Sequence, residues 1–222
     1  MDDLKYLLNR ASFDEIKALA DILKAKEPTV DRIIDRLSKK SQDAASYIFN
    51  EIFDDHPSYQ KIVRRAAKKL KIKCDKYESA SVMEIKIAQK VIETMWENMT
   101  PEQKRQMEEE LRKAASEFDK GGELLKSSSI FLALTGAKLS GFGIYLLAST
   151  SLGALTGMIG ITLPFVVYTT MSSTIALVLG PVGWIGAGLF TVWQLSEPSY
   201  KRVIPAIVYI CALRARLDGG FA

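Results

Sequence analysis

Apolar residues recur at helical spacing through residues 1–126, between start and stop signals for helices. Ser12 and Glu15 form a capping box, in which each side chain reaches the other residue's backbone amide. Ser81 with Glu84 repeats that pattern, and Thr100 precedes a proline that favours a first helical turn. The pattern predicts helices over residues 12–27, 29–37, 44–53, 59–70, 81–96 and 100–120, and a short one around residues 4–8. No stretch alternates with period two, so we expect an all-α fold.

The composition changes abruptly at residue 127. Residues 127–196 contain a single charged side chain, Lys138, and divide into apolar stretches at 130–149, 152–173 and 175–195. Each stretch is about 20 residues long, the length that spans a hydrocarbon core of about 30 Å. Pro164 and the pair Gly180-Pro181 are the expected breaks, which leaves two long helices or three short ones. A last amphipathic helix is expected over residues 206–217.

The apolar segment is rich in glycine, which favours close packing between helices. Gly153 and Gly157 are four residues apart, the small-xxx-small spacing of helix pairs in lipid. Basic residues flank both ends of the segment, and the positive-inside rule then favours a hairpin. The candidate residues for contact with lipid or a hydrophobic partner are Leu146, Gly153, Gly157, Val178, Trp184 and Trp193. For the two tryptophans, burial in a protein core is an equally good interpretation.

These observations predict three regions. Residues 1–126 form a charged amphipathic helical region, 127–196 a hydrophobic glycine-rich hairpin, and 197–222 a C-terminal helix that packs back on the bundle. The first region holds 25 of the 30 Lys and Arg and 24 of the 26 Asp and Glu. The net charge of +4 is too weak to indicate nucleic acid.

One predicted helix, over residues 59–70, is strongly basic on the face opposite its apolar stripe. Its basic residues are Lys61, Arg64, Arg65, Lys68 and Lys69. This face has three interpretations: the solvated outside of a bundle, a surface for anionic lipid, or a nucleic-acid surface. Lipid attraction is worth about 1 kcal/mol per basic residue. The apolar region elsewhere in the chain favours lipid over nucleic acid, because no recognition module accompanies the basic run.

Catalytic and metal-binding patterns are missing from the sequence. His56 is the single histidine, and Cys74 and Cys211 form no metal-ligand or redox motif. No phosphate-binding glycine loop or nucleophile motif occurs. We therefore expect no enzyme activity, no metal and no cofactor. The charged start without an apolar leader favours a cytoplasmic protein, peripheral or integral at the inner membrane.

Several stretches resemble the YaaW family of bacterial proteins of uncharacterised function. The resembling residues are 180–184 (GPVGW), 200–206 (YKRVIPA), 210–214 (ICALR), and Tyr59 with 69–73 (KLKIK). Residues 4–23 resemble a short domain that often precedes that family. The family has been grouped loosely with ubiquinol–cytochrome c chaperones, so the resemblance implies assembly of a membrane complex. It implies no catalytic residues.

Three functions are therefore compatible with the sequence. In the first, charged helices flank a hydrophobic hairpin that is inserted in a bilayer or sheltered until it meets one, an architecture analogous to pore-forming colicins. In the second, the protein is a chaperone or adaptor whose apolar region holds a hydrophobic client. In the third, it is a soluble bundle with a fully buried hairpin and an interaction role. A homo-oligomer fits each of them.

Overall fold

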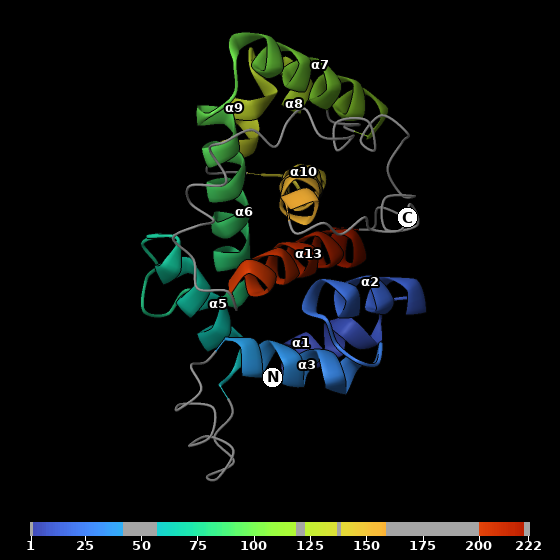
Figure 1. Ribbon diagram of the computed structural model, residues 1–222. Coiled ribbons are helices and arrows are strands. Elements are labelled where there is room, and N and C mark those ends of the chain that lie inside the picture. Colours follow the sequence, from blue (N-terminus) through green and yellow to red (C-terminus); the bar gives the residue numbers. More distant parts are fainter. Residues whose placement is uncertain (1, 42–56, 119–122, 137–138, 159–199, 220–222) are drawn as a thin grey trace.

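The computed structural model describes residues 2–41, 57–118, 123–136, 139–158 and 200–219. These residues form ten helices and no strand, which confirms the all-α prediction. The predicted helix over 44–53, the charge at Lys138 and most of the apolar segment lie outside the described residues. Figure 1 shows the helices arranged around α13 (Tyr200–Gly219), which crosses the middle of the molecule.

Three short helices form the N-terminal part: α1 (Asp2–Asn9), α2 (Phe13–Leu23) and α3 (Val30–Lys40). The capping box at the start of α2 is confirmed, since Ser12 and Glu15 make both reciprocal hydrogen bonds. Helix α2 ends at Lys24, whose φ of 53° places it in the left-handed region. Helices α2 and α3 pack against α13, and the hydroxyl of Tyr209 donates to the Glu15 carbonyl at 3.1 Å.

The next pair is α5 (Tyr59–Lys69) and α6 (Ala80–Glu97). Ser58 caps α5 by accepting a hydrogen bond from the Lys61 amide. The capping box predicted at Ser81 is wrong: Ser79 is the N-cap of α6. Glu84 has a different role, because its carboxylate is fully buried and binds a guanidinium from α13.

A second layer is formed by α7 (Pro101–Phe118), α8 (Glu123–Lys126) and α9 (Ile130–Thr135). The expected start of α7 is confirmed, since the side chains of Thr100 and Gln103 each bond the other residue's amide. Glu108 of α7 accepts hydrogen bonds from the first amides of α9, including that of Ile130 at 2.9 Å. A carboxylate at this position also complements the positive end of the α9 dipole.

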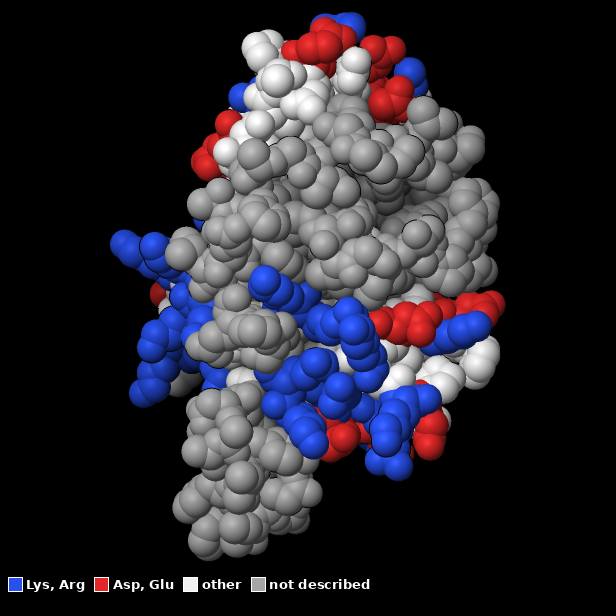
Figure 2. Space-filling view, viewed as in Figure 1, with Lys and Arg blue, Asp and Glu red and all other residues white. Residues whose placement is uncertain are grey.

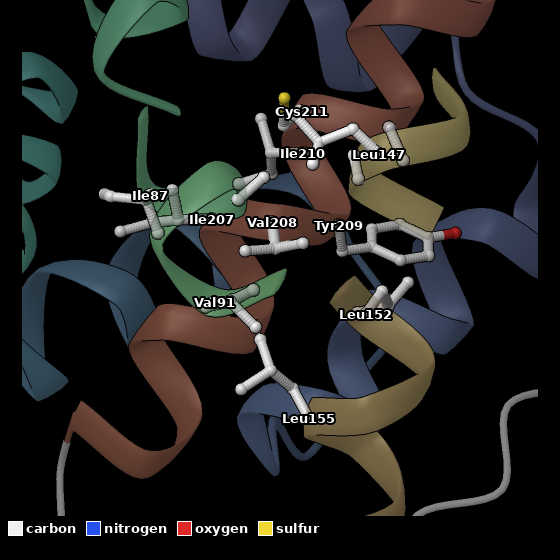
Figure 3. Close-up of a cluster of buried hydrophobic side chains, with 14 of the residues drawn as sticks. Ile87, Val91, Leu147, Leu152, Leu155, Ile207, Val208, Tyr209, Ile210 and Cys211 are labelled. Carbon is white, nitrogen blue, oxygen red and sulfur yellow. The ribbon is translucent and has the colours of Figure 1, made fainter. Parts of the chain in front are cut away.

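The centre of the core lies between α13, α6 and α10 (Gly141–Met158). In Figure 1 α10 is seen almost end-on while α13 runs across the view, so these helices cross steeply. Figure 3 shows apolar side chains from all three helices converging. They include Ile87 and Val91 of α6, Leu147, Leu152 and Leu155 of α10, and Ile207, Val208, Tyr209, Ile210 and Cys211 of α13.

The helix boundaries in the apolar segment differ from those predicted. The expected stretch over 130–149 is divided between α9 and α10, because α9 ends at Thr135 and α10 begins at Gly141. The Ser140 hydroxyl accepts from the Gly143 amide at 3.0 Å, as an N-cap does. Among the described residues, no helix is long and apolar enough to cross a membrane. The predicted hairpin extends beyond these residues.

The final helix begins earlier than the sequence indicated. The prediction placed its start at residue 206, after Pro205, whereas α13 begins at Tyr200 and includes that proline. Pro205 is the sixth residue of α13, beyond the four first amides that have no intrahelical partner, so it removes the helical hydrogen bond to the Lys201 carbonyl. The additional turn brings Lys201 and Arg202 onto the helix.

Candidate anionic-surface site

Helix α5 separates its apolar and basic residues onto opposite faces, as its sequence predicts. Ile62, Val63, Ala66 and Ala67 are fully buried. On the other face the side chains of Lys61, Lys68 and Lys69 are exposed. The Lys69 ammonium lies 5.5 Å from the centre of the Tyr200 ring, a distance suited to a cation–π contact.

The two arginines of the predicted set bind the protein itself. Arg64 is half-buried and donates to the carbonyl oxygens of Asp75, at 2.7 Å, and Lys76, at 3.0 Å. Arg65 donates to the Ser41 carbonyl at 3.4 Å. Arg64 therefore joins the loop after α5 to the helix, and Arg65 joins α5 to the end of α3. A lysine could not reproduce these two contacts, because its ammonium group lacks the rigid planar fork of N–H donors that the Arg64 guanidinium presents.

The loop between α5 and α6 extends the basic face. Lys71, Lys73 and Lys76 are all exposed, and Tyr77 is 86% exposed. The Lys76 ammonium lies 5.4 Å from the centre of the Tyr77 ring. Tyrosine is enriched where protein meets the membrane–water interface. Sequence reasoning did not select Tyr77, because a loop residue has no periodicity; its signal was an aromatic residue that follows three lysines.

We define the α5 basic face as Lys61, Lys68, Lys69, Lys71, Lys73, Lys76 and Tyr77. Figure 2 shows Lys and Arg side chains gathered on the lower half of one side of the molecule, over α3, α5 and the beginning of α13. Asp75 is an exposed acid within the loop, while Glu78 is paired with the Lys86 ammonium at 2.5 Å. Positive charge therefore dominates this surface.

The candidate residues of the apolar segment have different positions. Leu146 is fully buried in α10, and Gly153 is half-buried in the same helix. Gly157 lies in the last turn of α10. Val178, Trp184 and Trp193 lie outside the described residues. Within the described part, the structure thus brings the α5 lysines together on one surface and places Leu146 in the core.

One buried ion pair lies under the bundle surface. Glu84 of α6 is 0% exposed and receives hydrogen bonds from Arg214 of α13 at 3.2 and 3.3 Å. Burial raises the pKa of Glu84, and the opposing effect of Arg214 does not cancel it. Asp3 is a second partner of Arg214 at 3.0 Å. With Asp3, this pair links α1, α6 and α13.

Neither of the two cysteines is in an environment that favours a reactive thiolate. Burial raises the pKa of the Cys74 thiol and raises that of Cys211 far more, which disfavours the nucleophilic thiolate. His56 lies outside the described residues. In the part of the chain that the structure describes, no three potential metal ligands of His, Cys, Asp or Glu gather. A cavity between α2, α10 and α13, bordered by Tyr145 and Arg216, has about 20 Å³ of space, enough for one water molecule.

The described fold defines the protein as an all-α helical bundle. No known protein-family model matches the chain, and no solved structure matches it either. The chain is 28% identical over 159 residues to a UPF0174 protein of Helicobacter pylori strain J99, a match that covers 71% of this chain and 61% of that protein. It is 26% identical over 185 residues to a UPF0174 protein of strain 26695, covering 82% of this chain and 88% of the relative.

The chain therefore spans about three fifths of the first relative and most of the second. Neither name states an activity. The resemblance to the YaaW family and the implied role in assembling a respiratory complex stay predictions.

Proposed function

We propose that the protein is a non-enzymatic, membrane-associating helical bundle that binds anionic bilayers through the α5 basic face. The observation that carries this proposal is the combination of exposed lysines with the 86% exposed ring of Tyr77 on one surface. An amphipathic aromatic among cations suits the boundary between headgroups and water. The proposed partner is the negatively charged surface of a membrane leaflet, and not a nucleic acid.

The attraction is electrostatic and additive over several side chains. Each lysine near an anionic surface contributes about 1 kcal/mol at moderate ionic strength. The α5 basic face has six exposed lysines, at positions 61, 68, 69, 71, 73 and 76, which are enough for reversible binding even if only some of them reach the headgroups together. Since this attraction is screened within about 10 Å at 0.1 M salt, binding should weaken steeply as salt increases.

The burial of α10 supports the arrangement in which the apolar region is sheltered in the unbound protein. Residues 145–152 are buried without interruption, which is more than two helical turns. Every side of α10 is therefore covered over this length. In this proposal the bundle reaches the membrane by its basic surface, with α10 enclosed during that first contact.

Flotation of the purified protein with liposomes tests the proposal. We expect the protein to float with vesicles containing phosphatidylglycerol and to stay at the bottom with pure phosphatidylcholine. The double variant Lys61→Gln/Lys68→Gln should bind about 30-fold more weakly, the factor that corresponds to two lysines at about 1 kcal/mol each.

Lys17→Gln/Lys126→Gln is the matched control, because it removes two exposed lysines of α2 and α8 that lie away from α5. It should bind like the natural protein. Equal losses in both double variants would show a dependence on net charge alone. Failure of the natural protein to float with any anionic vesicle at low salt would refute the proposal.

A further inference from the structure

Four basic side chains that do not belong to the predicted set on α5 lie around the C-terminal end of α2. They are Lys24, Arg36, Lys40 and Arg202, and we call them the α2-end cluster. Arg202 donates through Nη1 to the Ile22 carbonyl at 2.8 Å and to that of Asp21 at 3.4 Å. Arg36 donates through Nε to the Leu23 carbonyl at 3.4 Å. Three consecutive carbonyls thus hold two guanidinium groups from α13 and α3 close together.

The electrostatic environment of the cluster is repulsive. Lys40 is half-buried, and its pKa is lowered by burial and then by the positive charges of Arg36, Arg202 and Lys24. The pKa of Arg202 is also lowered, by burial and then by Arg36. Among the described residues, none of the four forms an ion pair with an acidic side chain.

Capping of α2 explains only part of this arrangement. The C-terminal end of a helix carries roughly half a negative charge, which two guanidinium groups already exceed. The hydrogen bonds to carbonyls use one nitrogen of each arginine, and Nη2 of Arg202 and both Nη atoms of Arg36 have no further partner within the described residues. The ammonium groups of Lys24 and Lys40 add two more positive charges with no role in the cap.

We propose that the α2-end cluster is a binding site for a phosphate group, of the phosphomonoester type that carries two negative charges. Arginine forks held in place by backbone carbonyls present N–H donors in the geometry that suits phosphate oxygens. The lysines complete the neutralisation as point charges. A single carboxylate carries too little charge to balance four cations, whereas a phosphate dianion balances half of them directly and the α2 terminus offsets part of the rest.

The cluster adjoins the α5 basic face. The Ser41 carbonyl, directly after Lys40, accepts hydrogen bonds from Arg65 of α5 and from the Tyr200 hydroxyl of α13. The phosphate can therefore come from either a lipid headgroup or a soluble phosphorylated compound. Binding of phosphate goes beyond the proposed function, because it requires no membrane, and the two can fail separately.

Titration with inorganic phosphate, followed by isothermal calorimetry at constant ionic strength in chloride, tests the site. We expect saturable binding by the natural protein. In Lys40→Gln the affinity should fall about tenfold, since one charge-assisted contact is lost. Lys40 makes no hydrogen bond among the described residues, so this variant should keep the fold, which circular dichroism checks. Lys17→Gln is the control and should bind phosphate normally.

Vesicles distinguish the two sources of phosphate. Phosphatidic acid carries a phosphomonoester and phosphatidylglycerol a diester, and the two are compared at equal surface charge. A preference for phosphatidic acid that disappears in Lys40→Gln would assign the site to a lipid headgroup. Binding of free phosphate without such a preference would assign it to a soluble ligand.

If the natural protein shows neither phosphate binding nor a preference for phosphatidic acid, the α2-end cluster is not a phosphate site. Flotation with phosphatidylglycerol would then still support the proposed function. Conversely, phosphate binding by a protein that floats with no vesicle would support the cluster and refute the membrane proposal.

Discussion

Helices α10 and α5 differ in how much of their surface the rest of the molecule covers. Helix α10 has no charged residue, and residues 145–152 are buried one after another, so all its sides are enclosed. Helix α5 has five basic residues and buries one stripe, leaving the opposite side to solvent. The sequence of an amphipathic helix shows which face will be buried, because its apolar residues lie on one side. The sequence of a uniformly apolar helix shows that the helix must be covered, but it does not show by what.

The polar residues of α10 show how such a helix accommodates complete burial. Three of its buried hydroxyl groups, those of Thr150, Ser151 and Thr156, donate to carbonyls one turn earlier, as in the bond from Thr150 to Leu146 at 2.8 Å. Ser151 donates to Leu147 at 2.8 Å and to the Ala88 carbonyl of α6 at 3.0 Å. Because the hydrogen-bonding needs of these groups are met locally, the same sequence is compatible with lipid and with a protein core.

The largest expected effect comes from a charge placed inside α10. Leu146→Asp should lower the free energy of unfolding by about 4 kcal/mol or more, because it buries an unpaired carboxylate at a 0% exposed position. Urea unfolding followed by circular dichroism measures this loss.

The control for that substitution is Leu132→Asp in α9. It lies in the same apolar segment, but its side chain is 62% exposed, and the change should be tolerated. A stable Leu146→Asp variant that has lost vesicle binding would contradict the sheltered position of α10. It would indicate that this helix faces lipid instead.

The next largest effect is expected at the buried ion pair of Glu84 and Arg214. Arg214→Gln leaves the Glu84 carboxylate buried without its main partner, and we expect a loss of about 3–5 kcal/mol near pH 8. The pKa of Glu84 is already above its usual value of 4.5 because of burial, and it rises further without Arg214.

A raised carboxyl pKa gives the pH dependence a definite sign. The folded state then binds the Glu84 proton more tightly than the unfolded state does. The destabilisation caused by burying the charged carboxylate is therefore present above the folded pKa and vanishes below about 4.5. The deficit of Arg214→Gln should therefore be smaller at pH 5 than at pH 8 in urea unfolding. The double variant Glu84→Gln/Arg214→Gln should remove this difference; if it persists there, another group is responsible.

The contrast between α5 and α10 also explains what the sequence could predict. The all-α class, the cap at Ser12 and the buried stripe of α5 follow from local periodicity and local hydrogen bonds, which a sequence displays directly. The start of α6 was misplaced because Ser79 and Ser81 both precede a helical pattern. Glu84 fitted a capping box, but its partner Arg214 is 130 residues away.

The sequence predicted only those residues of the candidate surface that lie on one face of a helix. The α5 lysines share a helical face, so their spacing reveals them. Tyr77 lies in a loop, and the α2-end cluster joins side chains from α2, α3 and α13, which only the tertiary packing brings together. Arg64 and Arg65 have the helical spacing of this surface. Their hydrogen bonds go to carbonyl oxygens of neighbouring segments, and the helical spacing of α5 does not reveal those contacts.

The smallest effect tests the local origin of α5. Ser58→Ala removes the hydroxyl that accepts from the Lys61 amide, and it should cost about 1 kcal/mol in urea unfolding, the usual value for an N-cap. Ser128→Ala, at an exposed position before α9, is the matched control and should leave stability unchanged. Because the lysines of α5 keep their positions once the helix has formed, vesicle binding of Ser58→Ala should be normal below the unfolding transition. A Ser58→Ala protein as stable as the control would mean that the N-cap does not contribute to the stability of α5, which would then depend on its packing.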